Sequence, residues 1–168
     1  MIVVSPLHMV HELVKTRGIG RVIGLLAGCN EHPELPELAA TNDHLKLTMH
    51  DIAMPVEGMK PPGASQAEDL IAFIRGWDRQ KPMLIHCWAG ISRSTASAYI
   101  AQCILSPDRP EEALATELRH ISPPATPNPL IIAHADGLLG REGRMIAAIN
   151  NIGRGANAFE GNVFEWAM

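Results

Sequence analysis

A short segment in the middle of the chain constrains the fold more than any other feature of the sequence. An apolar run, Met83-Leu84-Ile85, leads into His86-Cys87-Trp88-Ala89-Gly90-Ile91-Ser92-Arg93-Ser94, and an alanine-rich pattern follows. This order predicts a strand, a tight loop and a helix over Ile91 to Leu105. In such an arrangement the backbone N–H groups of the loop face inward, and the helix N-terminus adds partial positive charge. The segment therefore predicts an anion-binding loop.

Two side chains of this loop suit chemistry on a phosphate group. Arg93 can donate two hydrogen bonds to one phosphate, and Cys87 lies at the base of the loop as a candidate nucleophile. The thiolate is the reactive form of cysteine. The helix N-terminus, the N–H groups and Arg93 all favour a negative charge on Cys87, and the same donors would stabilise phosphoryl oxygens in the transition state. Taken singly, Cys87 would be a core residue and Arg93 a surface residue, but the joint spacing favours a site.

The loop resembles the signature of a known family. The pattern His-Cys-x-x-Gly-x-x-Arg-Ser, carried by His86, Cys87, Gly90, Arg93 and Ser94, is similar to that of the cysteine-dependent protein tyrosine phosphatase superfamily. Small dual-specificity phosphatases are the best match, over about residues 20 to 120. The resemblance implies a phosphomonoester hydrolase with a cysteinyl-phosphate intermediate and no cofactor.

The resemblance also implies roles for individual residues. Cys87 would be the nucleophile, Arg93 would bind the phosphate, and Ser94 would assist the departure of the sulfur, while His86 would hold the shape of the loop. The residues expected to bind substrate are His86, Trp88, Ala89, Gly90, Ile91, Ser92 and Arg93. Trp88 would either stack at the mouth of the pocket or pack beneath it.

A phosphatase of this type also needs a general acid, because the leaving oxygen must receive a proton. The family places an aspartate on a loop before the cysteine. In this chain the alternating segment Leu45 to Met49 is followed by Asp51, which matches in position and context. Glu57 is the second choice, further along the same loop. A solvated carboxylate at the end of a strand is the alternative interpretation of Asp51.

The sequence predicts an α/β fold, with a mainly parallel central sheet of about four strands and helices on both faces. The expected strands are Ile2–Val4, Val22–Leu26, Leu45–Met49 and the run before Cys87. Strands joined by helices imply right-handed crossovers. Ligands bind at the carboxyl ends of such strands, and both Cys87 and Asp51 follow a strand.

Further helices are expected on both sides of this segment. They are Met9–Lys15, a helix opened by a capping box at Ser65-Gln66-Ala67-Glu68, Pro110–His120, and a final helix from Asn128-Pro129 to about Ile149. We expect one domain over residues 1–152 and a C-terminal tail over 153–168. The aromatic residues of that tail would dock on the body or on a second subunit; they are Phe159, Phe164 and Trp166.

Composition excludes several classes of partner. The chain has 168 residues and a net charge of −4, so it has no basic excess to hold nucleic acid or an anionic membrane. No apolar run approaches the roughly 18 residues of a membrane span, and the N-terminus lacks the pattern of a signal peptide. We therefore expect a cytoplasmic protein. The oligomeric state is left open.

Three cysteines do not make a disulfide framework. Cys103 lies on the helix after the loop, where core packing is expected. Cys29 follows the second predicted strand and is a candidate redox partner for Cys87, with an ordinary loop residue as the alternative.

No metal site is expected from the histidines. His8 and His11 are three residues apart but lack a third ligand, and His32, His44, His50, His120 and His134 show no ligand spacing. Arg141 and Arg144 would form salt bridges or, less commonly, bind an anion.

Two other classes of function stay open at this point. One is a non-catalytic phosphate-binding module, and the other is a rhodanese-like sulfur carrier. The expected substrate is a phosphorylated protein, with a small phosphorylated metabolite as the alternative. The loop lacks the lysines that relatives acting on phosphoinositides often carry at its variable positions.

Overall fold

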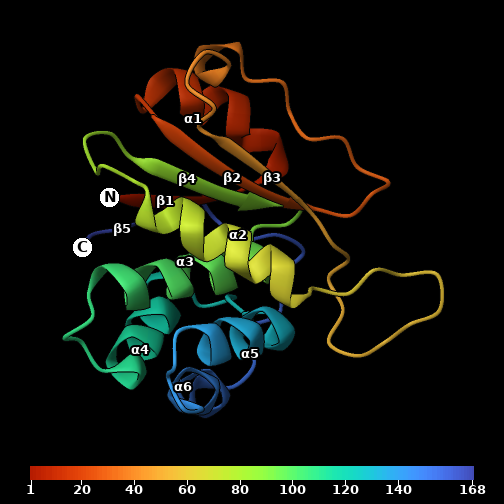
Figure 1. Cartoon of the computed structure of the whole chain (residues 1–168), viewed down its shortest axis with the longest axis vertical. Coiled ribbons are helices and arrows are strands. Elements are labelled where there is room, and N and C mark those ends of the chain that lie inside the picture. The colour runs from red at the N-terminus through yellow and green to blue at the C-terminus, as the bar shows by residue number, and fades with distance from the viewer.

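A five-stranded sheet lies at the centre of the computed structural model, which describes residues 1–168 (Figure 1). The strands lie in the order β3-β2-β4-β1-β5, and the first four are parallel, whereas β5 runs antiparallel to β1. Their bounds are β1 Ile2–Pro6, β2 Arg21–Leu26, β3 His44–Thr48, β4 Met83–Cys87 and β5 Phe164–Trp166. The predicted α/β fold with a mainly parallel sheet is confirmed.

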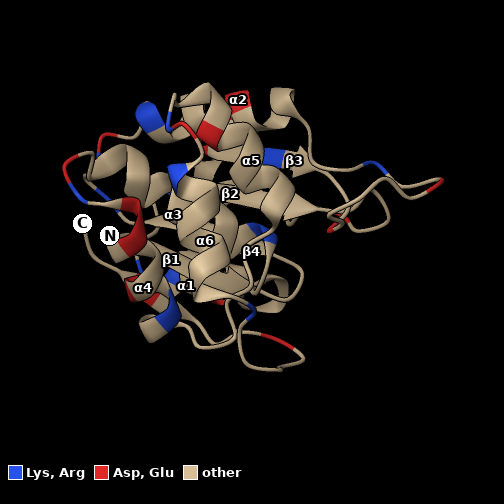
Figure 2. Ribbon diagram, turned by 90° about the horizontal axis from the view of Figure 1, so that it is seen from below, with Lys and Arg blue, Asp and Glu red and all other residues tan.

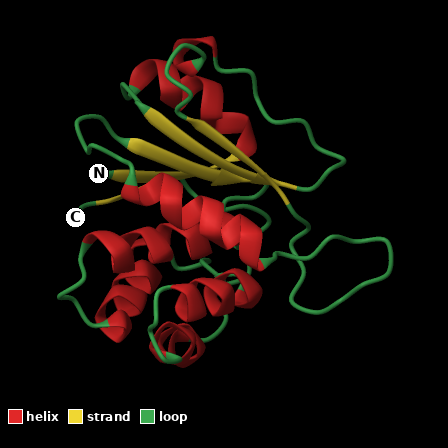
Figure 3. Ribbon diagram, in the orientation of Figure 1, coloured by secondary structure: helices red, strands yellow, loops and turns green.

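Helices cover both faces of the sheet, but unequally (Figures 1 and 3). One face carries α1 (Val10–Thr16) with the short 3-10 helices η1 (Leu7–Met9) and η2 (Pro36–Leu38). The other side holds five helices: α2 Ala64–Arg75, α3 Arg93–Leu105, α4 Glu111–Ile121, α5 Pro129–Leu138 and α6 Arg144–Ile152. Side chains alternate along the strands, so Val22 packs with the α1 side and Ile23 with the larger core opposite.

The helix α3 is buried along almost its whole length. It contacts β4 and β1 on one side and α2, α4 and α5 on the others. Its many alanine and serine residues let these neighbours approach closely, and Ser97 Oγ donates to the Arg93 carbonyl at 2.9 Å. The helix begins at Arg93, two residues later than predicted, because Ile91 and Ser92 still belong to the loop.

The start of α2 also differs from the sequence prediction. Its N-cap is Gly63, and the Gln66 side chain accepts a hydrogen bond from the Gly63 N–H at 3.0 Å. The capping box predicted at Ser65 is therefore wrong. Gln66 also donates to the Thr48 carbonyl at 3.1 Å, so the same side chain ties the start of α2 to the end of β3.

The predicted final helix is two helices. Asn128 is the N-cap of α5, as predicted. The chain then turns at Gly140 and Gly143, which have φ of +62° and +82°, a conformation that glycine adopts without strain. The Asp136 carboxylate accepts from the Gly143 N–H at 2.7 Å and from the Met145 N–H at 2.9 Å. Asp136 thus caps α6 from the end of α5.

The end of the chain joins the sheet. Residues Phe164 and Trp166 of β5 are buried beside β1, and Gln102 of α3 donates to the Ala167 carbonyl at 2.7 Å. Phe164 and Trp166 therefore dock on the body of the molecule, which is one of the two places expected for the aromatic residues of the tail. Phe159 does not, since it is 82% exposed.

Charged residues of both signs are interspersed over the fold (Figure 2). Arg141 and Arg144 both pair with Glu111, at 2.9 and 3.3 Å. The expected salt bridges are therefore present, and they tie α4 to the α5–α6 turn. None of the helices combines the length and apolar character that a membrane span requires.

Candidate active site

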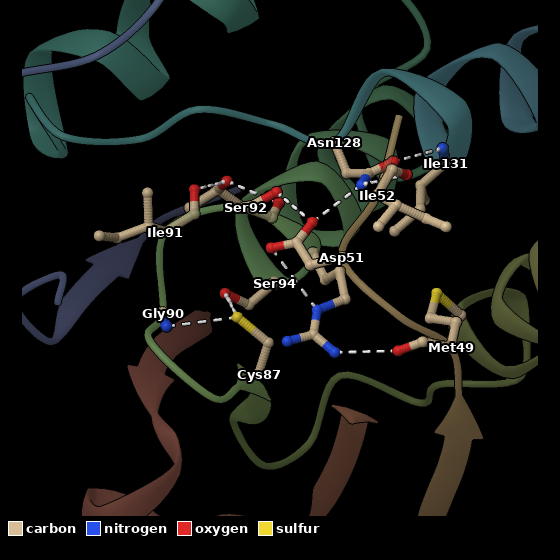
Figure 4. A network of polar contacts seen from close by, with 12 residues as sticks. Met49, Asp51, Ile52, Cys87, Gly90, Ile91, Ser92, Ser94, Asn128 and Ile131 are labelled. Atoms are coloured by element: carbon tan, nitrogen blue, oxygen red, sulfur yellow. Dashed lines mark hydrogen bonds and ion pairs between the residues drawn. The ribbon is translucent and has the colours of Figure 1, made fainter. Parts of the chain in front are cut away.

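The carboxyl ends of two strands bring Cys87 and Asp51 together. Cys87 is the last residue of β4, and Asp51 follows β3 by three residues. The two residues come from segments on opposite sides of β2 in the sheet. Figure 4 shows Asp51 beside Ser92 of the loop that joins β4 to α3, and above Cys87 at the base of that loop.

The loop from Cys87 to Arg93 is held from outside through its carbonyl groups. Four of these carbonyls accept hydrogen bonds from N–H groups of other segments: Trp88 from Leu7 at 3.1 Å, Ala89 from Gly161 at 2.8 Å, Ile91 from Thr126 at 2.9 Å, and Ser92 from Asn128 at 3.4 Å. All peptide bonds are trans, so each N–H points opposite to the carbonyl of the same peptide unit. The N–H groups of the loop therefore face its interior.

Cys87 shows the result of this arrangement. Its side chain is 1% exposed, and its Sγ accepts a hydrogen bond from the Gly90 N–H at 3.2 Å. Ser94 Oγ lies 3.2 Å from the same sulfur. Gly90 has a φ of +71°, and a Cβ at this position would lie 2.8 Å from the Pro6 nitrogen. Only glycine fits this turn of the loop.

Arg93 is buried and anchored at one end of its guanidinium group. Nη1 donates to the Met49 carbonyl at 3.0 Å. Nε has no hydrogen-bond partner and lies 3.7 Å from Asp51 Oδ2. The guanidinium is therefore fixed in orientation while its Nε remains free to donate to an oxygen atom in the loop.

Asp51 is positioned by two donors. Its Oδ1 accepts hydrogen bonds from Ser92 Oγ at 2.7 Å and from Asn128 Nδ2 at 2.8 Å. Asn128 is buried, and its Oδ1 caps α5 by accepting from the backbone N–H groups of residues 130 and 131. One asparagine thus links the start of α5 to the carboxylate. Glu57, the second candidate acid, is exposed and has no polar contact with the loop.

The mouth of the site carries two exposed aromatic rings. Trp88 is 46% exposed, and its ring meets the Phe159 ring edge to face at a centroid distance of 5.7 Å. Trp88 is therefore exposed and does not pack beneath the loop. An open groove next to the loop is lined by Ile91, Ser92, Arg154 and Phe159, among others. The sequence alone did not indicate that Arg154 and Phe159 of the C-terminal tail line this groove.

Two of the predicted site residues lie away from the loop interior. Cys29 is exposed on the loop after β2, and its sulfur accepts from Asn30 Nδ2 at 3.5 Å. His86 pairs in the sheet with Gly24 and lies on the α1 face, opposite to Cys87. There it meets His32 and His44, a grouping that the spacing of the histidines in the sequence did not indicate.

This fold and this loop define the scaffold of a dual-specificity-type phosphatase. A family model described as a DSP-PTPase phosphatase fused to NAD⁺ kinase matches residues 16–123. Because the match covers more than half of the chain, the protein belongs to this family. The matched residues, 16–123, agree with the range of about 20 to 120 over which the sequence resembles the phosphatase family.

Solved structures share the fold at low sequence identity. Human DUSP28 superposes with a TM-score of 0.62 and 15% identity, covering 84% of this chain and 89% of DUSP28. The human tyrosine phosphatase-like serine/threonine/tyrosine-interacting protein gives 0.61 and 16%, covering 84% and 92%. The PTP-2 phosphatase of Cydia pomonella gives 0.58 and 18%, covering 81% and 84%. No curated protein matches this sequence.

Proposed function

We propose that this protein is a phosphomonoester hydrolase that works through a cysteinyl-phosphate intermediate on Cys87. One observation carries the proposal: the Cys87 sulfur accepts a hydrogen bond from the Gly90 N–H inside the loop, and the Asp51 carboxylate is hydrogen-bonded to the same loop through Ser92. The first feature suits a thiolate and a phosphate. The second suits a proton donor at the entrance.

In the first step the Cys87 thiolate attacks phosphorus, and the bond from phosphorus to the leaving oxygen breaks. The loop N–H groups and Arg93 hold the three other phosphoryl oxygens as charge shifts among them. Asp51, protonated at this stage, donates its proton to the leaving oxygen. The product alcohol or phenol departs, and the phosphoryl group stays on the sulfur.

In the second step a water molecule attacks the cysteinyl phosphate. Asp51, now a carboxylate, accepts the proton that this water loses. The phosphorus–sulfur bond breaks, and inorganic phosphate forms. Ser94 Oγ, at 3.2 Å from the sulfur, donates a hydrogen bond to the departing thiolate and so restores the starting state.

The mouth of the site favours a substrate with an apolar or planar group beside its phosphate. The Trp88 and Phe159 rings offer a surface for stacking, and Arg154 adds a positive charge in the adjoining groove. Phosphotyrosine in a protein combines these features and is the first substrate proposed. A crystal structure of PTPMT1 with PI(5)P shares the fold at a TM-score of 0.56 and 15% identity, which makes phosphoinositides a useful comparison.

The proposal is tested by hydrolysis of p-nitrophenyl phosphate in the presence of EDTA, with and without vanadate. Wild type should turn over and be inhibited by vanadate, whereas Cys87→Ser should lose activity by roughly 10⁴-fold or more and still bind phosphate. Folded, reduced wild-type protein that binds phosphate without turnover would instead identify a phosphate-binding module. Thiosulfate-to-cyanide transfer would indicate a sulfur carrier.

A substrate panel then separates the possible physiological classes. It comprises a phosphotyrosine peptide, a phosphoserine peptide, a phosphoinositide and NADP⁺, the last because the family model joins this domain type to an NAD⁺ kinase. We expect the highest kcat/KM for the phosphotyrosine peptide. A higher kcat/KM for NADP⁺ or the phosphoinositide would exclude a phosphoprotein as the preferred substrate.

A further inference from the structure

Three histidines from separate segments converge on the α1 face of the sheet. His32 lies in the loop after β2, His44 begins β3, and His86 lies in β4. One ring nitrogen of each lies within 4.8 Å of those of the other two. The cluster plays no part in the mechanism proposed above, because Cys87 and the phosphate-binding loop lie on the other side of β4.

Five of the six ring nitrogens in this cluster are buried and have no hydrogen-bond partner in the protein. Both nitrogens of His32, both of His86 and Nε2 of His44 are in this state. Buried polar atoms in folded proteins are nearly always paired, because an unpaired one loses its hydration without compensation. His86 is the most severe case, since its residue is 0% exposed. Unpaired nitrogens on three converging histidine rings are the arrangement expected of a ligand-binding site.

The space for the cluster comes from a glycine in a buried strand. Gly24 of β2 pairs with His86 of β4. A Cβ on Gly24 would lie 2.7 Å from His32 Nδ1 and 2.7 Å from His86 Nε2. Glycine weakens the interior of a strand, and its presence there often marks close approach by another group. Here it lets two imidazole rings meet over the sheet.

We propose that His32, His44 and His86 form a binding site for a divalent transition metal, with Zn²⁺ as the best fit. Imidazole nitrogen is a preferred ligand of zinc, and three protein ligands leave a fourth position for water or another small ligand. Zinc–nitrogen bonds of about 2.0–2.1 Å require the three rings to draw together slightly. The ring nitrogens of His32 and His86 have no hydrogen-bond partner that would oppose this movement.

The charge state of the rings supports this assignment. Burial lowers the pKa of His44 to about 4 and that of His86 to about 3, and it lowers the pKa of His32 as well. The rings are therefore neutral near pH 7, and neutral imidazole is the form that binds a metal. The nearby cation Lys46 opposes a second positive charge, but its Nζ lies 3.3 Å from Glu34 Oε1, which partly compensates it.

A metal here would connect the strands that carry the active site. His44 and His86 lie on β3 and β4, whose carboxyl ends lead to Asp51 and Cys87. Binding would therefore cross-link these two strands over β2 and would stabilise the sheet beneath the phosphate-binding loop. The inference does not depend on the proposed hydrolase activity, because it concerns binding and stability.

The test is calorimetric titration of the full chain with Zn²⁺ in a Cys87→Ser background, so that the active-site thiolate cannot be the ligand. We expect one Zn²⁺ per chain and a rise in Tm on binding. The variants His44→Gln and His32→Asn should each weaken binding by more than the roughly 10- to 100-fold that loss of an outer-shell partner costs. Co²⁺ should give the visible absorption of a four-coordinate site, and both variants should lose it.

The double variant His8→Gln/His11→Gln is the matched control, because these histidines lie on the surface of the same side of the molecule. It should bind Zn²⁺ as the Cys87→Ser parent does. The proposal is overturned if the parent binds no Zn²⁺, if both cluster variants bind with the affinity of the parent, or if only the surface double variant loses binding. Because His32 lies in a loop, we expect His32→Asn to fold. Circular dichroism and Tm will establish this.

Discussion

Cys87 and His86 are neighbours on β4, yet they lie in opposite environments. Cys87 faces α3, and its sulfur has Gly90 N–H and Ser94 Oγ at 3.2 Å. His86 faces the α1 side, and neither of its ring nitrogens has a partner. A strand points successive side chains to opposite faces, so a single strand can support two sites back to back. The loop after Cys87 has its carbonyl groups paired with N–H groups of other segments, whereas the ring nitrogens of His32 and His86 have no partner in the protein.

On the Cys87 side, Arg93→Lys should reduce activity strongly while leaving the nucleophile in place. A lysine cannot hold the Met49 carbonyl and also present a second fixed donor to the phosphate, so kcat/KM should fall by about 10³-fold or more. The measurement is steady-state hydrolysis of p-nitrophenyl phosphate, with the exposed Arg75→Lys as a control. Activity near that of wild type would show that the loop needs only a positive charge.

Asp51→Asn should lower kcat by roughly 10²- to 10⁴-fold. The asparagine can keep the hydrogen bond from Ser92 but cannot supply a proton, so the loss should be larger for an alkyl phosphate than for p-nitrophenyl phosphate. Rates on the two substrates give the ratio directly. Glu57→Gln is the control and should stay near wild type. Full activity of Asp51→Asn on the alkyl phosphate would remove Asp51 from the mechanism.

Gly90→Ala tests whether the shape of the loop matters independently of its reactive groups. The substitution places a Cβ 2.8 Å from the Pro6 nitrogen and keeps a φ of +71°, which L-residues adopt at a cost. The loop must shift, and we expect kcat/KM to fall by at least about tenfold. Gly137→Ala is the control, because its Cβ would meet nothing within 4 Å. Equal activity of the two variants would contradict the argument.

Gly24→Ala is the corresponding change on the histidine side. Its methyl group would press on His32 and His86, and such overpacking costs about 1–2 kcal/mol. We expect a Tm lower by several degrees together with weaker Zn²⁺ binding, measured by thermal melts with and without the metal. A variant that melts like wild type and binds Zn²⁺ equally would show that the cluster does not need this space.

The smallest effect is expected at Cys103. Burial raises the pKa of this thiol to about 12, so almost none of it is thiolate near pH 8. Iodoacetamide should therefore leave Cys103 unmodified in the folded protein, whereas the exposed Cys29 should react. Peptide mass spectrometry after alkylation measures both sites. Modification of Cys103 at the rate of Cys29 would show that α3 opens more readily than its burial implies.

The phosphate-binding loop could be predicted because its parts are adjacent in the sequence. The apolar run before Cys87 predicts a strand, and the small residues after Arg93 predict a helix. The residues between them must therefore form the loop that joins the two elements. Asp51 was predicted from the resemblance to the phosphatase family, and its place just after a strand agrees with the rule that ligands bind at the carboxyl ends of parallel strands. Asn128, which donates a hydrogen bond to Asp51, was predicted only as a helix cap, because the tertiary fold brings these two distant residues together.

The histidine cluster and the last strand were beyond this kind of argument. His32, His44 and His86 share no spacing, and they meet because the order β3-β2-β4 places their segments side by side over a glycine. Likewise, β5 pairs Phe164 with Val4, far away in the sequence, and only three residues pair, too few for a periodic signal. Local sequence thus determined the loop between β4 and α3, whereas long-range strand pairing decided which distant side chains gather behind it.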